Sequence, residues 1–281
     1  MVYNFGSESL RCVVDTIGAE LVSVKLNGKE RLWQNDNGSW SGHAPVLFPF
    51  AGHCVVKKEG VNYSIPRHGV ARRQPFALVS ITESEATFVL RANDETKAMY
   101  PFDFSLYITY VVEGNSIKVI YRVVNEGEET MYAAFGSHES YALDGEVDEY
   151  EAVFEQEEDF TSLVTHPEDG RLLAETKSYG KGTHLPFPKQ ELNNTVVLKG
   201  VNSRVVYLKK IGEEAPLAKL TYNGFSNMLF WHPKESRMVC MEPWQNLPDV
   251  YGVEKEISEN SWLNAIEPKA EYTVEHEIEY F

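Results

Sequence analysis

Apolar and polar residues alternate with a period of two, and this feature most constrains how the 281-residue chain can fold. The alternation is clearest over residues 104–112, 117–124 and 272–280. Residues on one face of a strand recur at every second position, so each stretch predicts a half-buried antiparallel strand. Shorter strands are predicted at residues 10–14, 20–25, 76–82, 86–91, 195–198, 205–209, 217–222 and 228–231.

Turn signals separate these stretches, and helical signals are weak. Asn27-Gly28 lies between apolar runs and is typical of a type I′ hairpin turn, which needs positive φ at both central residues. No stretch of twelve or more residues has the 3.6-residue periodicity of an amphipathic helix. We therefore expect an all-β fold, a large antiparallel sandwich or barrel, with residues 1–281 in a single domain and an acidic, loop-like segment over 145–191.

Charge and cysteine content indicate which partners the protein avoids and in which compartment it is located. The chain has 26 Lys and Arg against 42 Asp and Glu, a formal net charge of −16, which repels nucleic acid and anionic membranes. Cys12, Cys54 and Cys240 are odd in number and form no CxxC pair, which favours free thiols in a cytoplasmic protein. The N-terminus lacks a signal-peptide pattern, and no apolar run has membrane-spanning length. A monomer and a homodimer both fit the sequence.

The signatures of several enzyme classes do not occur in the sequence. It contains no GxGxxG, no P-loop, no GxSxG and no HExxH. His43, His53 and His68 do not have the spacing of a standard metal site, and no cysteine or carboxylate accompanies them. We therefore expect neither a metal nor a cofactor.

Four segments differ from ordinary strand sequence: GHAPVLFPFAGH (42–53), RHGVAR (67–72), FGSHESY (135–141) and CMEPWQNLPD (240–249). The first is interrupted by Pro and predicts irregular backbone. Together the segments supply histidines, a glutamate and a tryptophan at predicted strand–loop junctions. Such a set predicts a sugar pocket, because aromatic rings stack on the apolar faces of a sugar while polar groups bind its hydroxyls. Tyr222, Trp231 and Trp262 are further candidates for stacking.

The order of these segments resembles the aldose 1-epimerase (galactose mutarotase) superfamily, and within it the LacX-like branch. Members of that branch have R-x-x-P-x-L-F-P-x-x-G-R, HGFAR, G-x-H-P and C-x-E-P-W segments in the same order. The resemblance extends from Gly42 to Asp249. It implies a large antiparallel β-supersandwich and an isomerase that interconverts the anomers of a monosaccharide without cofactor or metal.

The resemblance also implies roles for individual residues. Glu242 matches the general base, which takes the proton of the C1 hydroxyl, and His138 matches the general acid, which protonates the ring oxygen. The ring opens to the aldehyde, the C1–C2 bond rotates, and closure on the other face gives the other anomer. The residues expected to bind the substrate are His53, His68, Arg72, Asn194 and Trp244.

Three positions depart from the family pattern. His53 stands where relatives have Arg, Glu139 where Pro usually follows the acid histidine, and Asn194 where Asp is expected. An imidazole does not stay charged or bind pairs of hydroxyls as a guanidinium does. A non-catalytic carbohydrate-binding protein of the same fold is therefore an alternative. A glycosidase ranks last, because it needs two carboxylates and only Glu242 is anchored in a motif.

A cationic stretch raises a second alternative. Residues 57–73 contain one acid, Glu59, and five cations, Lys57, Lys58, Arg67, Arg72 and Arg73. Next to His68 this stretch could bind the phosphate of a 6-phosphosugar, which predicts a hexose-6-phosphate 1-epimerase. The structural interpretation is a solvated loop in which Arg72 pairs with a carboxylate.

Overall fold

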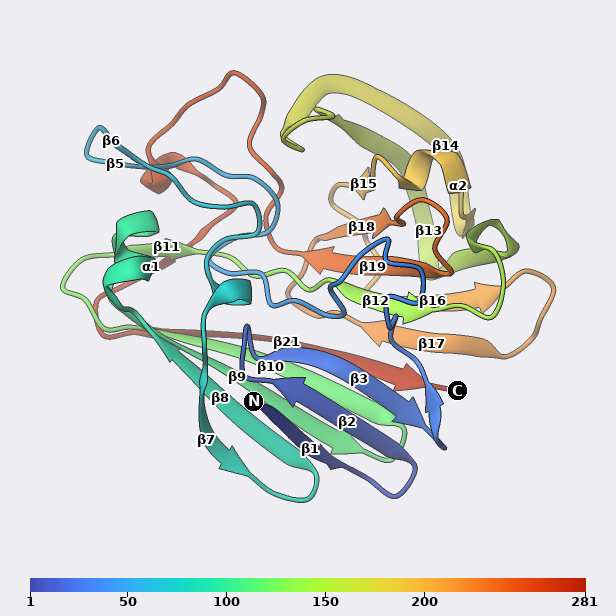
Figure 1. Cartoon of the computed structure of the whole chain (residues 1–281). Coiled ribbons are helices and arrows are strands. Elements are labelled where there is room, and N and C mark those ends of the chain that lie inside the picture. The colour runs from blue at the N-terminus through green and yellow to red at the C-terminus, as the bar shows by residue number, and fades with distance from the viewer.

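The computed structural model describes all 281 residues and consists mainly of antiparallel strands (Figure 1). A four-stranded sheet contains β1 (Val2–Gly6), β2 (Leu10–Asp15), β3 (Glu20–Leu26) and β4 (Lys29–Glu30). A 13-stranded sheet has the order β12-β19-β18-β15-β13-β16-β17-β21-β10-β9-β8-β7, with β14 paired to β13. Two further sheets pair β5 with β6 and β11 with β20.

The strands of the large sheet are β7 (Ala77–Ile81), β8 (Glu85–Arg91), β9 (Phe104–Glu113), β10 (Ser116–Asn125), β12 (Glu139–Ala142), β13 (Tyr150–Thr165), β14 (Leu172–Pro186), β15 (Val196–Leu198), β16 (Val205–Lys210), β17 (Pro216–Thr221), β18 (Asn227–Trp231), β19 (Met238–Trp244) and β21 (Glu271–Tyr280). The short strands are β5 (Val56–Lys58), β6 (Val61–Tyr63), β11 (Met131–Ala133) and β20 (Asn264–Ile266). The α-helices, α1 (Asp94–Met99) and α2 (Lys189–Leu192), are short. Neither is long and apolar enough to cross a membrane.

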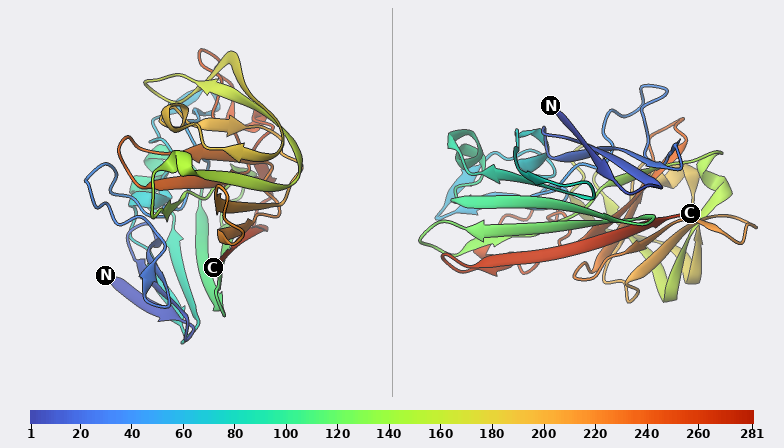
Figure 2. Two further views of the ribbon diagram at one scale, coloured as in Figure 1. Left: turned by 90° about the vertical axis from the view of Figure 1, so that its right-hand side faces the viewer. Right: turned by 90° about the horizontal axis from the view of Figure 1, so that it is seen from below.

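Two layers of strands enclose the core. The four-stranded sheet lies over β8, β9, β10 and β21, as the view from below shows (Figure 2). A cluster of 63 buried hydrophobic residues extends from Phe5 to Tyr280. The hydroxyl of Tyr110 in β9 donates a hydrogen bond of 2.7 Å to the carbonyl of Ala19, which joins the layers. Burial of the apolar faces between two layers of strands stabilises a sandwich, the fold class that the alternation predicts.

The strongest sequence signals are confirmed in detail. The three long alternating stretches form β9, β10 and β21, with β10 paired to both of the others. Asn27 and Gly28 connect β3 to β4 with φ of 49° and 82°, so both central residues have the positive φ that a type I′ turn requires.

The prediction of a loop over residues 145–191 is wrong, because most of this segment forms the β13–β14 hairpin. The register shifts between Val153 and Glu158, which interrupts the alternation of buried positions in β13. Glu158 is itself buried and accepts hydrogen bonds from the backbone and the hydroxyl of Ser203. Strand β14 is mostly exposed and polar. Because a buried position of β13 holds an acidic residue and β14 is polar on both faces, the sequence of this hairpin does not alternate between apolar and polar residues.

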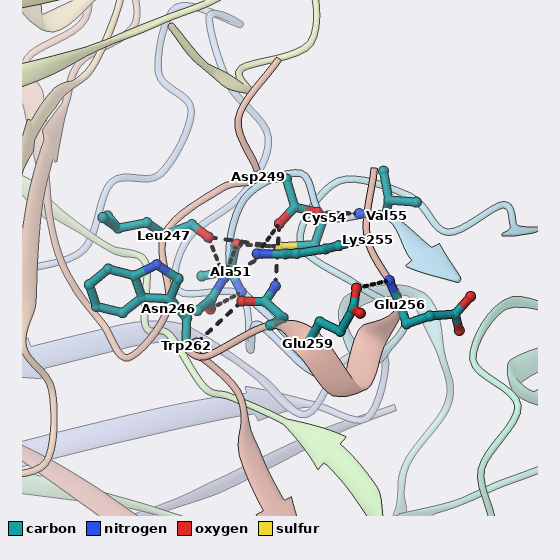
Figure 3. Close-up of polar contacts among 11 residues, drawn as sticks. Ala51, Cys54, Val55, Asn246, Leu247, Asp249, Lys255, Glu256, Glu259 and Trp262 are labelled. Carbon is teal, nitrogen blue, oxygen red and sulfur yellow. Dashed lines mark hydrogen bonds and ion pairs between the residues drawn. The ribbon is translucent and has the colours of Figure 1, made fainter. Parts of the chain in front are cut away.

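The segment 42–53 is irregular, as expected, and its second half is fixed by the chain that follows β19 (Figure 3). The side-chain amide of Asn246 accepts a hydrogen bond from Ala51 N and donates one to Ala51 O, both of 2.9 Å. The Asp249 carboxylate accepts a bond of 2.7 Å from Val55 N. These contacts fix the loop that leads to His68 relative to the strand that contains Glu242.

Candidate active site

His138 and Glu242 meet on one face of the large sheet. Glu139 of β12 pairs with Met241 of β19, so the next position of the antiparallel ladder places His138 opposite Glu242. Nε2 of His138 lies 3.4 Å from Oε2 of Glu242, and both side chains are buried. The strand register therefore joins two residues that are far apart in the sequence.

A cleft of about 330 Å³ opens at this pair. This volume is at the lower end of the range for small-molecule sites. The cleft is lined by Trp40, Arg67, His68, Arg72, Arg73, His138, Thr195, Trp231, Glu242 and Trp244. Aromatic rings and hydrogen-bonding groups thus face one hollow, as a sugar site requires.

His68 is held as a hydrogen-bond donor. Its φ of 69° is unusual for a residue other than glycine, and its Nδ1 accepts a bond of 3.0 Å from Gly52 N. Burial and the neighbouring His138 lower the pKa of His68 well below its usual range, so the ring is neutral. With Nδ1 acting as acceptor, the proton of the neutral ring is on Nε2, which can donate to a ligand oxygen.

The His138–Glu242 pair holds one proton near neutral pH. Burial raises the pKa of Glu242 to about 8, against the opposing influence of Arg67. Burial, and after it the charges of Arg72 and Arg67, lower the pKa of His138 to about 3. Between these values the proton is on the carboxyl group, and the imidazole is neutral. If this proton moves from Glu242 to His138, the carboxylate becomes available as a base and the imidazolium as an acid. The pair still holds one proton in that form.

Tryptophan rings surround His138. Trp40 stacks on the imidazole at 5.2 Å between ring centres with a tilt of 24°, and Trp231 contacts it edge-on at 5.9 Å. The position of Trp40 depends on Gly42, because a Cβ at that residue would lie 2.4 Å from the Trp40 ring. These rings shield the pair from water and offer an apolar surface to a ligand.

Three guanidinium groups, those of Arg67, Arg72 and Arg73, face the same cleft. None of the three makes an ion pair with a carboxylate. The arginines that do so are Arg122, Arg171 and Arg237. The interpretation in which Arg72 pairs with a carboxylate is therefore not what the structure shows. The three positive charges are available to an anionic group of a ligand.

Of the seven predicted site residues, the cleft brings together His68, Arg72, His138, Glu242 and Trp244. It does not include His53 or Asn194. His53 follows the turn at Gly52, which has a φ of 77°, and its backbone carbonyl accepts a hydrogen bond from Asp249 N. Asn194 lines a different polar hollow, beside Asn193 and His232.

Sequence reasoning missed Trp40 and Thr195. Trp40 lies in a loop without a recognisable motif, and only the structure shows that this loop reaches His138. Thr195 was assigned to a strand, but it precedes β15 with a φ of 65° and lines the cleft. Arg67 and Arg73 were found only as part of the cationic stretch.

A metal ion could in principle contact three groups here. Ligand atoms of His138, Cys240 and Glu242 lie within 4.8 Å of one another. However, burial raises the pKa of the Cys240 thiol well above its usual value, whereas a metal binds the thiolate. Nδ1 of His138 also has no hydrogen-bond partner, unlike the second nitrogen of most metal-binding histidines. The residues fit an acid–base pair better than a metal site.

Comparisons with known proteins agree with this geometry. The family model for aldose 1-epimerase matches residues 1–278. Protein LacX (plasmid) of Lactococcus lactis subsp. lactis is 27% identical over 274 residues, 88% of each chain. A galactose mutarotase-like protein from Lactobacillus casei ATCC 334 has the same fold, with a TM-score of 0.92 at 21% identity over 100% of both chains. A protein of Escherichia coli (strain K12) named "Putative glucose-6-phosphate 1-epimerase" is 34% identical over 100 residues, 32% of each chain. The chain therefore belongs to the aldose 1-epimerase family.

Proposed function

We propose that this protein interconverts the α and β anomers of an aldose by acid–base opening and closure of the sugar ring. The observation that supports this most is the His138–Glu242 pair, with its atoms 3.4 Å apart in a cleft lined by tryptophans. Ring opening requires one group to take a proton and another to give one, and this pair contains both. No cofactor is part of the proposal.

In the proposed reaction the ionised Glu242 takes the proton of the C1 hydroxyl, while protonated His138 gives a proton to the ring oxygen. The ring C–O bond breaks and leaves the open-chain aldehyde. After rotation about C1–C2, His138 takes the proton back from the C5 hydroxyl and Glu242 returns one to the new C1 oxygen. The positive charges of Arg67 and Arg72 favour the carboxylate form of Glu242, which the first step needs.

His68 and the tryptophans hold the sugar in place. The Nε2–H of His68 is oriented by Gly52 N and donates to a ring or hydroxyl oxygen. Trp244 contacts the His68 ring edge-on at 5.6 Å and is itself fixed by a hydrogen bond from its Nε1 to Ser137 O. Fixed aromatic rings cost little entropy when a ligand binds, so they keep C1 and the ring oxygen near the acid–base pair.

The test is NMR anomer exchange on a panel of aldoses and their 6-phosphates. We expect the protein to accelerate exchange of at least one sugar above the spontaneous rate. If sugars bind but none exchanges faster, the non-catalytic carbohydrate-binding alternative replaces the proposal.

A second candidate is a hexose-6-phosphate 1-epimerase, favoured by the three unpaired guanidinium groups at the cleft. Guanidinium groups bind phosphate in a bidentate manner with charge-assisted hydrogen bonds. The name of the Escherichia coli relative is consistent with this substrate class. If the candidate is correct, glucose 6-phosphate exchanges faster than glucose.

Arg73→Gln tests the phosphate interaction, because Arg67 and Arg72 also act on the pKa of Glu242. We expect KM for the 6-phosphate to rise about 10- to 100-fold, the effect of losing a hydrogen bond to a charged group, and KM for the free sugar to change little. Arg91→Gln is the control, since Arg91 is exposed on β8 and does not line the cleft. Equal effects of Arg73→Gln on both sugars would exclude a phosphate contact.

The pH dependence follows from the pair. With pKa values of about 8 for Glu242 and about 3 for His138, the pair holds one proton between these limits. Raising the pH through about 8 removes that proton, so no acid remains for the ring oxygen. We expect kcat/KM to be level from pH 5 to 7 and then to fall toward tenfold per pH unit above about 8. Activity that keeps rising to pH 10, after subtraction of the spontaneous rate, would contradict this.

We also propose that the whole chain acts as one domain in the cytoplasm. Its three cysteines, Cys12, Cys54 and Cys240, are free and buried. Free thiols persist in a reducing compartment, which fits this location.

A further inference from the structure

A buried carboxylate lies directly behind the acid–base pair. Glu139 follows His138 in the chain, and its side chain is 3% exposed. Its Oε2 accepts a hydrogen bond of 2.7 Å from the Ser137 hydroxyl, and its Oε1 lies 3.0 Å from Nε2 of His276 in β21.

The strand geometry separates Glu139 from the cleft by one layer of backbone. Successive side chains of a strand point to opposite faces, so His138 and Glu242 face the cleft while Glu139 faces the interior. Ser137 connects the two sides, because its carbonyl accepts the Trp244 indole N–H and its N–H donates to Pro243 O. A charge at Glu139 is therefore near the pair without contacting a ligand.

The surroundings keep this carboxylate ionised. Burial acts to raise the pKa of Glu139, but His276 and Ser137 outweigh it, and the pKa is lowered. The other titratable groups near it are the hydroxyls of Tyr110 of β9, Tyr121 of β10, Tyr141 of β12 and Tyr280 of β21, and the thiol of Cys240 of β19, which lies on the cleft side of the sheet. All five are neutral acids whose pKa the Glu139 charge raises. On the cleft side, Arg67 and Arg72 act on Glu242 in the opposite sense.

We propose that Glu139, held by Ser137 and His276, is a positioning residue that keeps the single proton on the His138–Glu242 pair into mildly alkaline conditions. This rests on the proposed epimerase function, in which the pair must hold one proton. The direction of the electrostatic effect supports this role, because the negative charge of Glu139 raises the pKa of Glu242.

The experiment compares the wild type with Glu139→Gln, which keeps the shape and removes the charge. We expect the upper limb of the kcat/KM–pH profile to move down by about one pH unit, with rates near wild type at pH 5 to 6. Glu139→Asp, which retains the charge, should restore most of the wild-type profile. Glu158→Gln removes another buried, hydrogen-bonded carboxylate that does not line the cleft, and it should leave the profile unchanged.

A second measurement does not depend on activity. NMR titration of the His138 ring and of ¹³C-labelled glutamate carboxyls reports the proton of the pair directly. The upper pKa of the pair should fall in Glu139→Gln by the same unit. If that variant does not fold, Glu139→Met/His276→Leu removes the charge and its partner together, a change that is often nearly neutral for stability.

The outcomes separate the two proposals. An unchanged titration of the pair, or a uniform loss of rate at every pH, overturns the role of Glu139. No anomer exchange by the wild type overturns the proposed function, while the NMR titration still decides whether Glu139 holds the proton on the pair.

Discussion

Glu242→Gln is expected to slow anomer exchange by 10²-fold or more, the usual effect of losing a general base. The amide keeps the size of the side chain but can neither accept the C1 proton nor return it. Because the side chain is only 2% exposed, water has little access to replace it. The measurement is saturation-transfer NMR between the two anomers, with Glu158→Gln as a second buried glutamate replaced in the same way. A rate near wild type would remove Glu242 from the mechanism.

His138→Asn should cause a loss of similar size, because the ring oxygen then leaves without a proton. The double variant should be little slower than either single variant, since the two groups act as one unit and removing either stops the transfer. Losses that multiply in the double variant would show that the groups act independently.

Gly69→Ala is expected to have the largest effect on stability, about 3 to 4 kcal/mol in the free energy of unfolding. Gly69 has a φ of 77°, and a Cβ there would lie 2.1 Å from the carbonyl oxygen of Phe48. That oxygen accepts a hydrogen bond of 2.8 Å from Val70 N, so relieving the clash breaks this bond and displaces the neighbouring His68.

Gly60→Ala separates the clash from the backbone strain. Gly60 has nearly the same φ, 78°, but nothing lies within 4 Å of its Cβ position. Its replacement should cost about 1 kcal/mol, the penalty of a left-handed conformation alone. Denaturant unfolding of both variants measures the difference. Equal losses would show that contact with Phe48 has no energetic effect.

The sequence predicted most of the fold because its main strands have one buried and one solvent-facing side. β9, β10 and β21 are such strands, and their alternation is unambiguous. The β13–β14 hairpin was missed because its stability does not depend on regular alternation: Glu158 is buried with hydrogen-bond partners, and β14 is exposed. The hydrogen-bond partners of Glu158 are distant in the sequence, so no local sequence pattern indicates that this acid is buried.

The site residues that lie in a recognisable motif could be predicted from the sequence. Those that reach the site only because of the path of the chain in three dimensions could not. His138 and Glu242 were assigned from their segments, and the strand register brings them together. Trp40 reaches His138 from a loop whose sequence has no such motif. His53 was assigned by analogy with an arginine, but the turn at Gly52 leads it away from the lining of the cleft.

The pairing of β12 with β19 also allows chemistry and selectivity to vary independently. The proposed acid, His138, and the proposed base, Glu242, are neighbours across one ladder, so their separation depends on register and not on the length of the chain between them. That intervening chain includes β13, β14 and α2, and it supplies Thr195 and Trp231 to the cleft wall. Insertions there can reshape the cleft while the distance between His138 and Glu242 stays the same. A one-residue slip of β12 would instead turn His138 into the interior and so separate the two groups on which the proposed reaction depends.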